Sequence, residues 1–237
     1  MPPLIAVFAG LAAVDITAVA AGWPVLEWLS KPLLAPVLAL HLWFTTGRRH
    51  AAVLAGLGFA AAGDIALLLP GAGAFAVGLG FFLGAQICWT AAFVRAGAVA
   101  HLRSHRSLCV GYLAAWSAAV VVLAPALGPG MALALTLYSL ALVVMAGTAH
   151  TMGRRAAWGG AVFVASDLLI GLGAAGVDFA GRSLLVMPTY TIALFLLVTA
   201  FTADAVRTVQ AGGRAAVPSS AAVPIVSSAD RRAGRAK

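Results

Sequence analysis

Long runs of apolar residues, separated by short polar, glycine- or proline-containing segments, cover most of this chain. A helix needs about 17 to 25 mostly apolar residues to cross a bilayer. Eight runs of that length predict transmembrane helices at about residues 4–22, 30–46, 51–69, 73–94, 107–124, 130–150, 157–176 and 183–203. The first run has no basic residues before it and contains Asp15, which indicates a transmembrane helix rather than a cleaved signal peptide. The short connections favour antiparallel neighbours in one bundle.

Composition supports this interpretation. Of the 237 residues, 62% are hydrophobic and only 9% are charged, and the mean hydropathy is +1.02. A soluble domain carries about 25% charged residues, so this chain has too few to cover a surface that faces water. We therefore expect an all-α fold: a polytopic membrane helix bundle with eight transmembrane helices.

The distribution of basic residues predicts the orientation of the bundle. If the N-terminus lies inside the cell, only Lys31 and Arg182 of the fifteen basic residues fall in outer segments. The inner segments hold Arg48, Arg49, Arg95, Arg103, Arg106, Arg154, Arg155, Arg207, Arg214, Arg231, Arg232, Arg235 and Lys237. This asymmetry follows the positive-inside rule with both termini in the cytoplasm. It explains the net charge of +8 without a nucleic-acid partner, and it predicts a multi-pass protein of the inner (plasma) membrane.

The domain organisation predicted from composition is simple. Residues 1–206 would form the transmembrane domain. After about Val209 the chain becomes poor in large apolar residues and rich in Ala, Ser, Pro and Arg. We expect residues 207–237 to be a disordered basic cytoplasmic tail, whose arginines can contact anionic lipid headgroups.

Two aspartates, Asp64 and Asp167, lie inside apolar runs, each preceded by a small residue, Gly63 or Ser166. An intramembrane acid costs a few kcal/mol or more on insertion scales, and it therefore indicates a functional site. The alternative is a neutral carboxyl that hydrogen-bonds a neighbouring helix and only aids packing. For Asp15, which has no matched partner, both interpretations stay open.

Depth estimates bring the polar side chains close to one another. From the rise per residue of about 1.5 Å, Asp15 and Asp167 should lie near the middle of the membrane and Asp64 somewhat toward the outer side. Tyr190 should lie roughly 10 Å in from the outer end of the last helix, so one cavity could hold all four. Lys31 is expected to open the second helix, where it either anchors at the boundary or points down toward the acids.

Several kinds of site have no support in the sequence. His41 and His150 are predicted in the inner halves of helices, away from the acids, and neither an HxxxH nor an HExxH pattern occurs. We therefore expect no metal and no cofactor. The GxSxG elbow of serine hydrolases and the Walker glycine loop do not occur either.

Five short motifs carry a resemblance to a known family. They are KPL at 31–33, F-x-x-x-G-D-x-x-L-L from Phe59, F-x-x-G-A-Q from Phe81, F-V-x-S-D-L-L from Phe163, and V-M-P-T-Y ending at Tyr190. Together they resemble the YhhN-type lysoplasmalogenase family over essentially all eight predicted helices. The two Asp motifs, in this order, are the most specific part.

The resemblance implies a function in lipid metabolism. Members of that family are eight-helix membrane hydrolases that cleave the vinyl ether bond of lysoplasmalogens, giving a fatty aldehyde and glycerophospho-ethanolamine or glycerophospho-choline. By resemblance, Lys31, Asp64, Asp167 and Tyr190 occupy the polar positions of the family. The chain departs from the family at Gln86, where a His is typical, and after Tyr190, where no Gln follows.

These residues suggest an acid–base mechanism for an ether hydrolase. Vinyl ethers are opened by acid through an oxocarbenium ion, so we expect Asp64 and Asp167 to act as acid and base, in an order that the sequence leaves open. Tyr190 and Gln86 would orient water or the glycerol hydroxyl, and Lys31 would bind the phosphate of a lysophospholipid, with Asp15 as a further polar residue of the site. The alternatives are a proton-coupled small-solute transporter that uses the Asp pair and a non-catalytic lipid-binding protein. No particular protein partner is indicated.

Overall fold

The computed structural model describes residues 2–215, and these residues form helices joined by short connections. The long helices are α1 (Pro2–Ala21), α2 (Pro24–Thr46), α3 (Ala51–Leu68), α4 (Ala72–Arg95), α6 (Arg106–Leu123), α7 (Pro129–Ala149), α8 (Arg154–Ala174) and α9 (Arg182–Ala215). Seven stretches of the described residues are long and apolar enough to cross a membrane, and one of them, Pro24–Leu68, contains both α2 and α3. The prediction of an all-α membrane bundle is confirmed.

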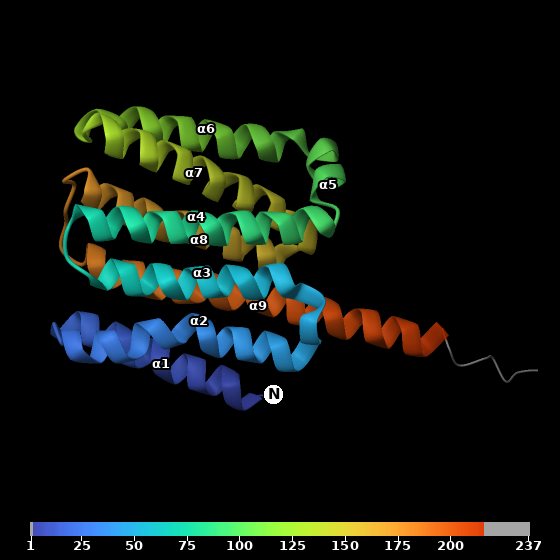
Figure 1. The fold of residues 1–237 in the computed structure, drawn as a ribbon. Helices are drawn as coiled ribbons and strands as arrows, with labels where there is room; N and C mark the ends of the chain where they lie inside the picture. Colours follow the sequence, from blue (N-terminus) through green and yellow to red (C-terminus); the bar gives the residue numbers. More distant parts are fainter. Residues whose placement is uncertain (1, 216–237) are drawn as a thin grey trace, which may run out of the picture. The chain divides into compact units, whose positions relative to one another are not determined.

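Residues up to Ala205 form one compact unit, in which the long helices run side by side (Figure 1). Helix α1 packs on α2, α2 on α3, α3 on α4, and α4 and α8 both pack on α7. Helix α9 is central, since its Phe195 ring stacks near Phe8 of α1 and its Phe201 ring on Phe93 of α4. Helix α6 lies at the edge against α7, and none of the residues 106–123 is buried.

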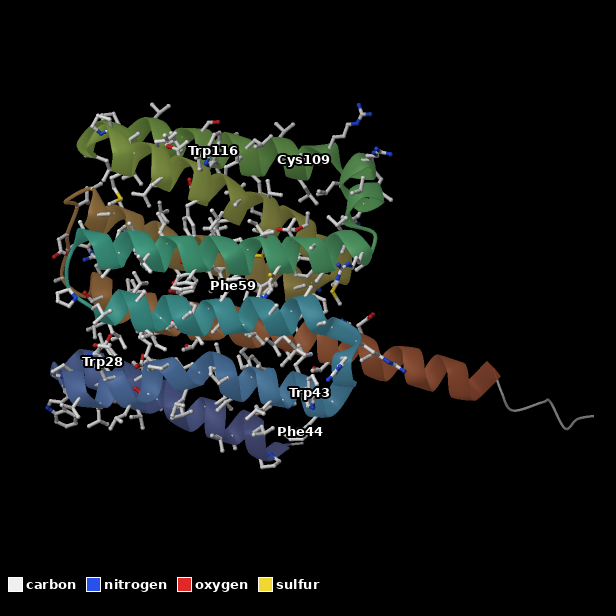
Figure 2. The ribbon with its side chains drawn as sticks, viewed as in Figure 1. Trp28, Trp43, Phe44, Phe59, Cys109 and Trp116 are labelled. Atoms are coloured by element: carbon white, nitrogen blue, oxygen red, sulfur yellow. The ribbon has the colours of Figure 1, made fainter. Side chains whose placement is uncertain are left out.

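The connections divide the charges between the two ends of this unit. The 3-10 turn η1 (Gly47–His50), the short helix α5 (Ala98–Ser104) and the turn η3 (His150–Met152) lie at or beside the arginine-rich end, which we call the inner end. Figure 2 shows Trp28 near the opposite, outer end and Trp43 near the inner end. The Arg48 guanidinium lies 5.6 Å from the centre of the Trp43 ring. Aromatic residues at both ends are typical of the two membrane boundaries.

Small residues let the helices approach closely. A Cβ atom added at Gly160 of α8 would lie 2.8 Å from the Ala146 Cα of α7. A Cβ atom added at Gly56 of α3 would lie 2.2 Å from the Trp89 Nε1 of α4. Membrane helices associate through such small residues because lipid offers no hydrophobic force between helices. Both glycines therefore set the spacing of the helices that carry the polar residues.

The second helix begins earlier than predicted. It starts at Pro24, which occupies the first helical turn, rather than at about residue 30, and Pro32 therefore lies inside the helix. Proline suits the first turn because its missing N–H has no partner there, and membrane helices tolerate internal prolines. As a result, Lys31 lies in the third turn of α2 instead of at its opening.

The end of the last helix also differs from the prediction. Helix α9 runs on to Ala215, so residues 207–215 of the predicted disordered tail are helical. This stretch has no proline, and residues 207–211 have no glycine either, although Gly212 and Gly213 follow. The rest of the predicted tail, 216–237, lies outside the described residues.

Candidate functional site

Asp64 of α3 is 1% exposed and is held by a tyrosine of α9. The Tyr190 hydroxyl donates a hydrogen bond of 2.7 Å to its Oδ2. The Tyr190 ring is fixed edge-on between Phe82 of α4 and Phe163 of α8, with centroids 5.9 and 5.8 Å away. A Cβ atom at Gly63 would meet the Phe82 ring at 2.7 Å, so the small residue before Asp64 lets α4 approach at this level.

Tyr190 lies in a stretch of α9 that contains a proline. Pro188 lies inside α9, two residues before Tyr190. The Thr189 hydroxyl donates to the Leu185 carbonyl at 2.6 Å, and the Thr191 hydroxyl donates to the Met187 carbonyl at 2.9 Å. Both hydroxyls bond carbonyls of the preceding turn of their own helix, as threonine commonly does inside a helix. Helix α9 is continuous through the motif V-M-P-T-Y, and it presents Tyr190 to Asp64.

Asp167 of α8 has a tyrosine partner of its own, which the sequence reasoning missed. The Tyr138 hydroxyl of α7 donates a hydrogen bond to the Asp167 Oδ2. The small residue before this acid also ties two helices together, since the Ser166 hydroxyl donates to the Val186 carbonyl of α9 at 3.2 Å. A signal was present: a tyrosine in the middle of a predicted span needs a hydrogen-bond partner when it is buried. The acids and tyrosines thus form two pairs.

A cavity of about 280 Å³ lies beside the second pair, between α4, α6, α7 and α8. Its wall is mostly apolar, and its polar residues include Thr136, Tyr138, Ser139 and Asp167. Among the acids of residues 3–205, Asp167 is the one that lines this cavity, and Asp64 does not. The edge helix α6 forms one wall and is joined to α7 by a hydrogen bond of 3.0 Å from the Trp116 Nε1 to the Ser139 Oγ (Figure 2 shows Trp116 on α6).

On the other side of Asp64, a group of polar residues joins α1 to α2. The Ser30 hydroxyl donates to the Asp15 Oδ1 at 2.8 Å, so this acid does have a partner on a neighbouring helix. The Lys31 ammonium lies 3.5 Å from the Glu27 carboxylate, and the side chains of Lys31 and Glu27 are 13% and 27% exposed. Lys31 also lies within electrostatic range of Asp15 and Asp64. The contact of Lys31 is thus with Glu27, one turn nearer the outer end of α2, and both interpretations of Lys31 stay open.

These groups line up across the bundle. Asp64 lies within electrostatic range of both Asp15 and Asp167, and Tyr190 within range of Asp167 and Tyr138. We call the following residues the polar row: Glu27, Lys31, Ser30, Asp15, Asp64, Tyr190, Gln86, Tyr138 and Asp167. The row begins on α1 and α2 and ends at the cavity, so it passes through the layers of helices seen in Figure 1.

Gln86 lies beside the Tyr138 hydroxyl. It is 1% exposed, and neither its Oε1 nor its Nε2 has a hydrogen-bond partner of ordinary geometry in the protein. The Oδ2 of the fully buried Asp15 has no such partner either. The polar row therefore contains three buried polar atoms with unused hydrogen-bonding capacity, at two separate positions.

All six predicted site residues belong to the polar row, but they lie in three separate parts of it. Asp167 faces the cavity, Asp64, Tyr190 and Gln86 lie behind it, and Lys31 and Asp15 lie at the far side of the row. The cavity wall does not include Lys31, so a phosphate held by this ammonium would be separated from a chain in the cavity. Within residues 3–205 no group of three or more His, Cys, Asp or Glu side chains could hold a metal ion.

Comparison with known proteins identifies a family. The model of the YhhN family matches residues 26–201, about three quarters of the chain; the match begins inside α2 and does not include α1. No curated protein and no solved structure matches the chain.

Proposed function

The chain belongs to the YhhN family and is a membrane protein, and from this premise we propose that it is an ether-bond hydrolase. Its substrate is a lysoplasmalogen or a related lysolipid with a vinyl ether bond. The products are a fatty aldehyde and a glycerophospho-alcohol such as glycerophospho-ethanolamine or glycerophospho-choline. The proposed location is the inner (plasma) membrane of the cell, where the lipid reaches the site from the bilayer.

One observation carries this proposal: a carboxyl held by a tyrosine, Asp167 with Tyr138, opens onto an apolar cavity among membrane helices. A cavity of this composition suits a hydrocarbon chain, because burial of apolar surface drives such binding. The single acid in the wall would then lie against an otherwise inert chain. A vinyl ether is a group of such a chain that a carboxylic acid can activate.

The reaction needs only proton transfer and water. An acid adds a proton to the vinyl carbon distal to oxygen, which forms a C–H bond and leaves an oxocarbenium ion. Water then adds to the carbon next to oxygen and gives up a proton to the carboxylate of the second residue, which yields a hemiacetal. Return of this proton to the first carboxylate restores the acid. Finally the C–O bond to glycerol breaks, and the hemiacetal proton moves to the glycerol oxygen. One water is consumed for each aldehyde released.

Two carboxyls that interact at short range lose their protons in separate steps, so one can be protonated while the other is ionised. We propose that Asp64 and Asp167 act as such a pair, and each has a tyrosine that fixes its orientation. A fixed carboxylate also stabilises the positive charge of the oxocarbenium ion, as in glycoside hydrolysis. We assign acid and base catalysis to this pair.

The test uses purified, folded protein with lysoplasmalogen and with its saturated ether analogue. Aldehyde is expected from the vinyl ether alone. Asp64→Asn and Asp167→Asn should each lower the rate by about 100-fold or more, the range of general acid–base catalysis. Asp178→Asn is the matched control, since this outer carboxyl is 75% exposed and bonds Arg182. Near-full activity in both Asn variants, or equal aldehyde from both lipids, would show the proposal to be wrong.

A transporter would need a polar path that continues from the acids through the inner half of the bundle. The described core there includes Leu42, Val53, Phe93, Met145 and Phe201, each 2% exposed or less. Its buried threonines, Thr46, Thr148 and Thr202, donate to carbonyls of their own helices. This packing favours a site that is reached from the outer side and from lipid. Solute-driven proton flux in liposomes, without aldehyde release, would support transport instead.

A further inference from the structure

Hydrolysis needs water as well as lipid. The lipid chain requires apolar surroundings, whereas water requires polar groups. The cavity beside Asp167 has mostly apolar walls, one of which is the edge helix α6. We propose that the polar row is the route by which water enters from the outer end, between α1 and α2, and reaches Asp64 and Asp167. This inference rests on the proposed function, to which it adds the path of the second substrate.

The entrance of this route lies at the outer end of α2. Glu27 is the fourth residue of α2 and Lys31 the eighth, so both lie within about 11 Å of the end of the helix along its axis. The Lys31 ammonium and the Glu27 carboxylate are 3.5 Å apart, and both side chains are partly exposed at the surface. An acid and a base of this kind hold water at a membrane boundary, where an apolar pair would exclude it.

The interior of the route has unused hydrogen-bonding capacity. The Asp15 Oδ2 and both polar atoms of Gln86 are buried and have no partner in the protein. Buried polar atoms in folded proteins are satisfied by protein or by ordered water, and in lipid an unsatisfied group costs several kcal/mol. Water at these two positions, on α1 and on α4, would bracket Asp64 and complete the hydrogen bonding of the row.

The route ends at the reacting groups. From Asp15, which Ser30 bonds, the proposed route continues to Asp64 and its partner Tyr190, and past Tyr138 to Asp167. Asp64 is the first of the two acids on this route and does not line the cavity, whereas Asp167 lines the cavity. The geometry thus assigns Asp64 to the water that attacks the oxocarbenium carbon and Asp167 to the lipid. Asp15 and Gln86 are positioning residues, since they hold the water in place and do not contact the lipid.

Thiol accessibility tests the route without any reference to catalysis. In a background with Cys88→Ala and Cys109→Ala, single cysteines are placed by Gln86→Cys and by the matched control Ala85→Cys. Ala85 is adjacent on α4, at the same depth and equally buried, but it belongs to the apolar core. Silver ions, which are small enough to follow water, are added from the outer side. Thiols that remain free are then counted by maleimide labelling after denaturation.

A cysteine in closed packing reacts only when helices open locally, so we expect Gln86→Cys to be blocked at least about tenfold faster than Ala85→Cys. Adding Asp15→Leu to Gln86→Cys should slow the block, because the leucine closes the row near its entrance. Equal rates for the two cysteines, or a rate that Asp15→Leu leaves unchanged, would overturn the route.

Hydrolysis provides a second measurement. Asp15→Leu should lower kcat by about tenfold or more with little change in the KM for the lipid, since it limits water and leaves the cavity intact. Asp15→Asn, which still binds water, should restore most of the rate. A rise in KM with unchanged kcat would contradict the assignment of Asp15. If silver ions block the Gln86→Cys thiol quickly but the protein releases no aldehyde, the proposed hydrolase function is wrong and the water route is still supported.

Discussion

The replacement Tyr138→Phe isolates the contribution of one hydrogen bond to the proposed reaction. It removes the hydroxyl that donates to the Asp167 Oδ2 and keeps the ring that lines the cavity. A hydrogen bond to a charged group contributes about 1.5 to 3 kcal/mol. Each 1.4 kcal/mol or so changes a rate tenfold, so kcat for vinyl ether cleavage should fall by about 10- to 150-fold. KM should change little, because the apolar contact with the lipid chain remains.

The matched control is Tyr112→Phe. Tyr112 lines the same cavity from α6, but its hydroxyl lies 3.1 Å from the His150 Nε2 near the inner end and is not bonded to an acid. Steady-state hydrolysis of lysoplasmalogen by both variants, in the same detergent and with thermal unfolding checked for each, gives the comparison. Tyr112→Phe should stay within about threefold of the unmodified protein, since the loss of a neutral hydrogen bond costs only about 0.5 to 1.5 kcal/mol of stability and touches no reacting group.

Two results would refute this reasoning. If Tyr138→Phe kept full kcat, the hydrogen bond to Asp167 would have no part in catalysis. If both variants lost activity equally, the loss would come from the cavity wall as a whole and not from the pair. A rise in KM alone in Tyr138→Phe would assign Tyr138 to lipid binding rather than to the acid.

Three further predictions concern the cavity, the helix spacing and the outer connection. Ala161→Phe, at the inner part of the cavity, should raise the KM for long alkenyl chains more than for short ones, measured with a chain-length series. Gly160→Ala should lower stability by about 1 to 3 kcal/mol, because the new methyl group meets the α7 backbone at Ala146, which no side-chain rotation relieves; thermal unfolding in detergent measures this. Arg182→Ala should destabilise by about 1 to 2 kcal/mol because it removes a hydrogen bond to an α8 carbonyl as well as the bond to Asp178, whereas Asp178→Asn should cost under about 1 kcal/mol.

The site residues that can be predicted from the sequence are those whose side chains are energetically costly to place in lipid. Asp64 and Asp167 stood out because a carboxyl in an apolar run needs a reason, and the resemblance added Tyr190. The helical class followed from composition and run length alone, since lipid leaves the backbone few other ways to satisfy its hydrogen bonds.

The rest depended on which helix faces lie together. Tyr138 is an ordinary residue in an apolar run until the approach of α7 and α8 at Gly160 brings it to Asp167. The apolar periodicity of such helices is weak because lipid and core are both apolar, so no polar face marks the cavity. For Lys31 the error came from the helix start: once α2 begins at Pro24, Lys31 lies deeper than its position after Ser30 in the sequence suggested.

The depth of Asp167 in the membrane indicates which lipid can reach the site and where it would meet the water. Asp167 lies seven residues from the outer end of α8, roughly 10 Å along the helix. The cavity extends inward from there to Tyr112 and Ala161. A lysolipid of the outer leaflet places its glycerol near the boundary and its chain toward the middle of the membrane, so its ether bond can meet Asp167 without the lipid leaving the bilayer. Water comes to the same depth from the α1–α2 side, and the two reactants meet between Asp64 and Asp167 because each is excluded from the route of the other.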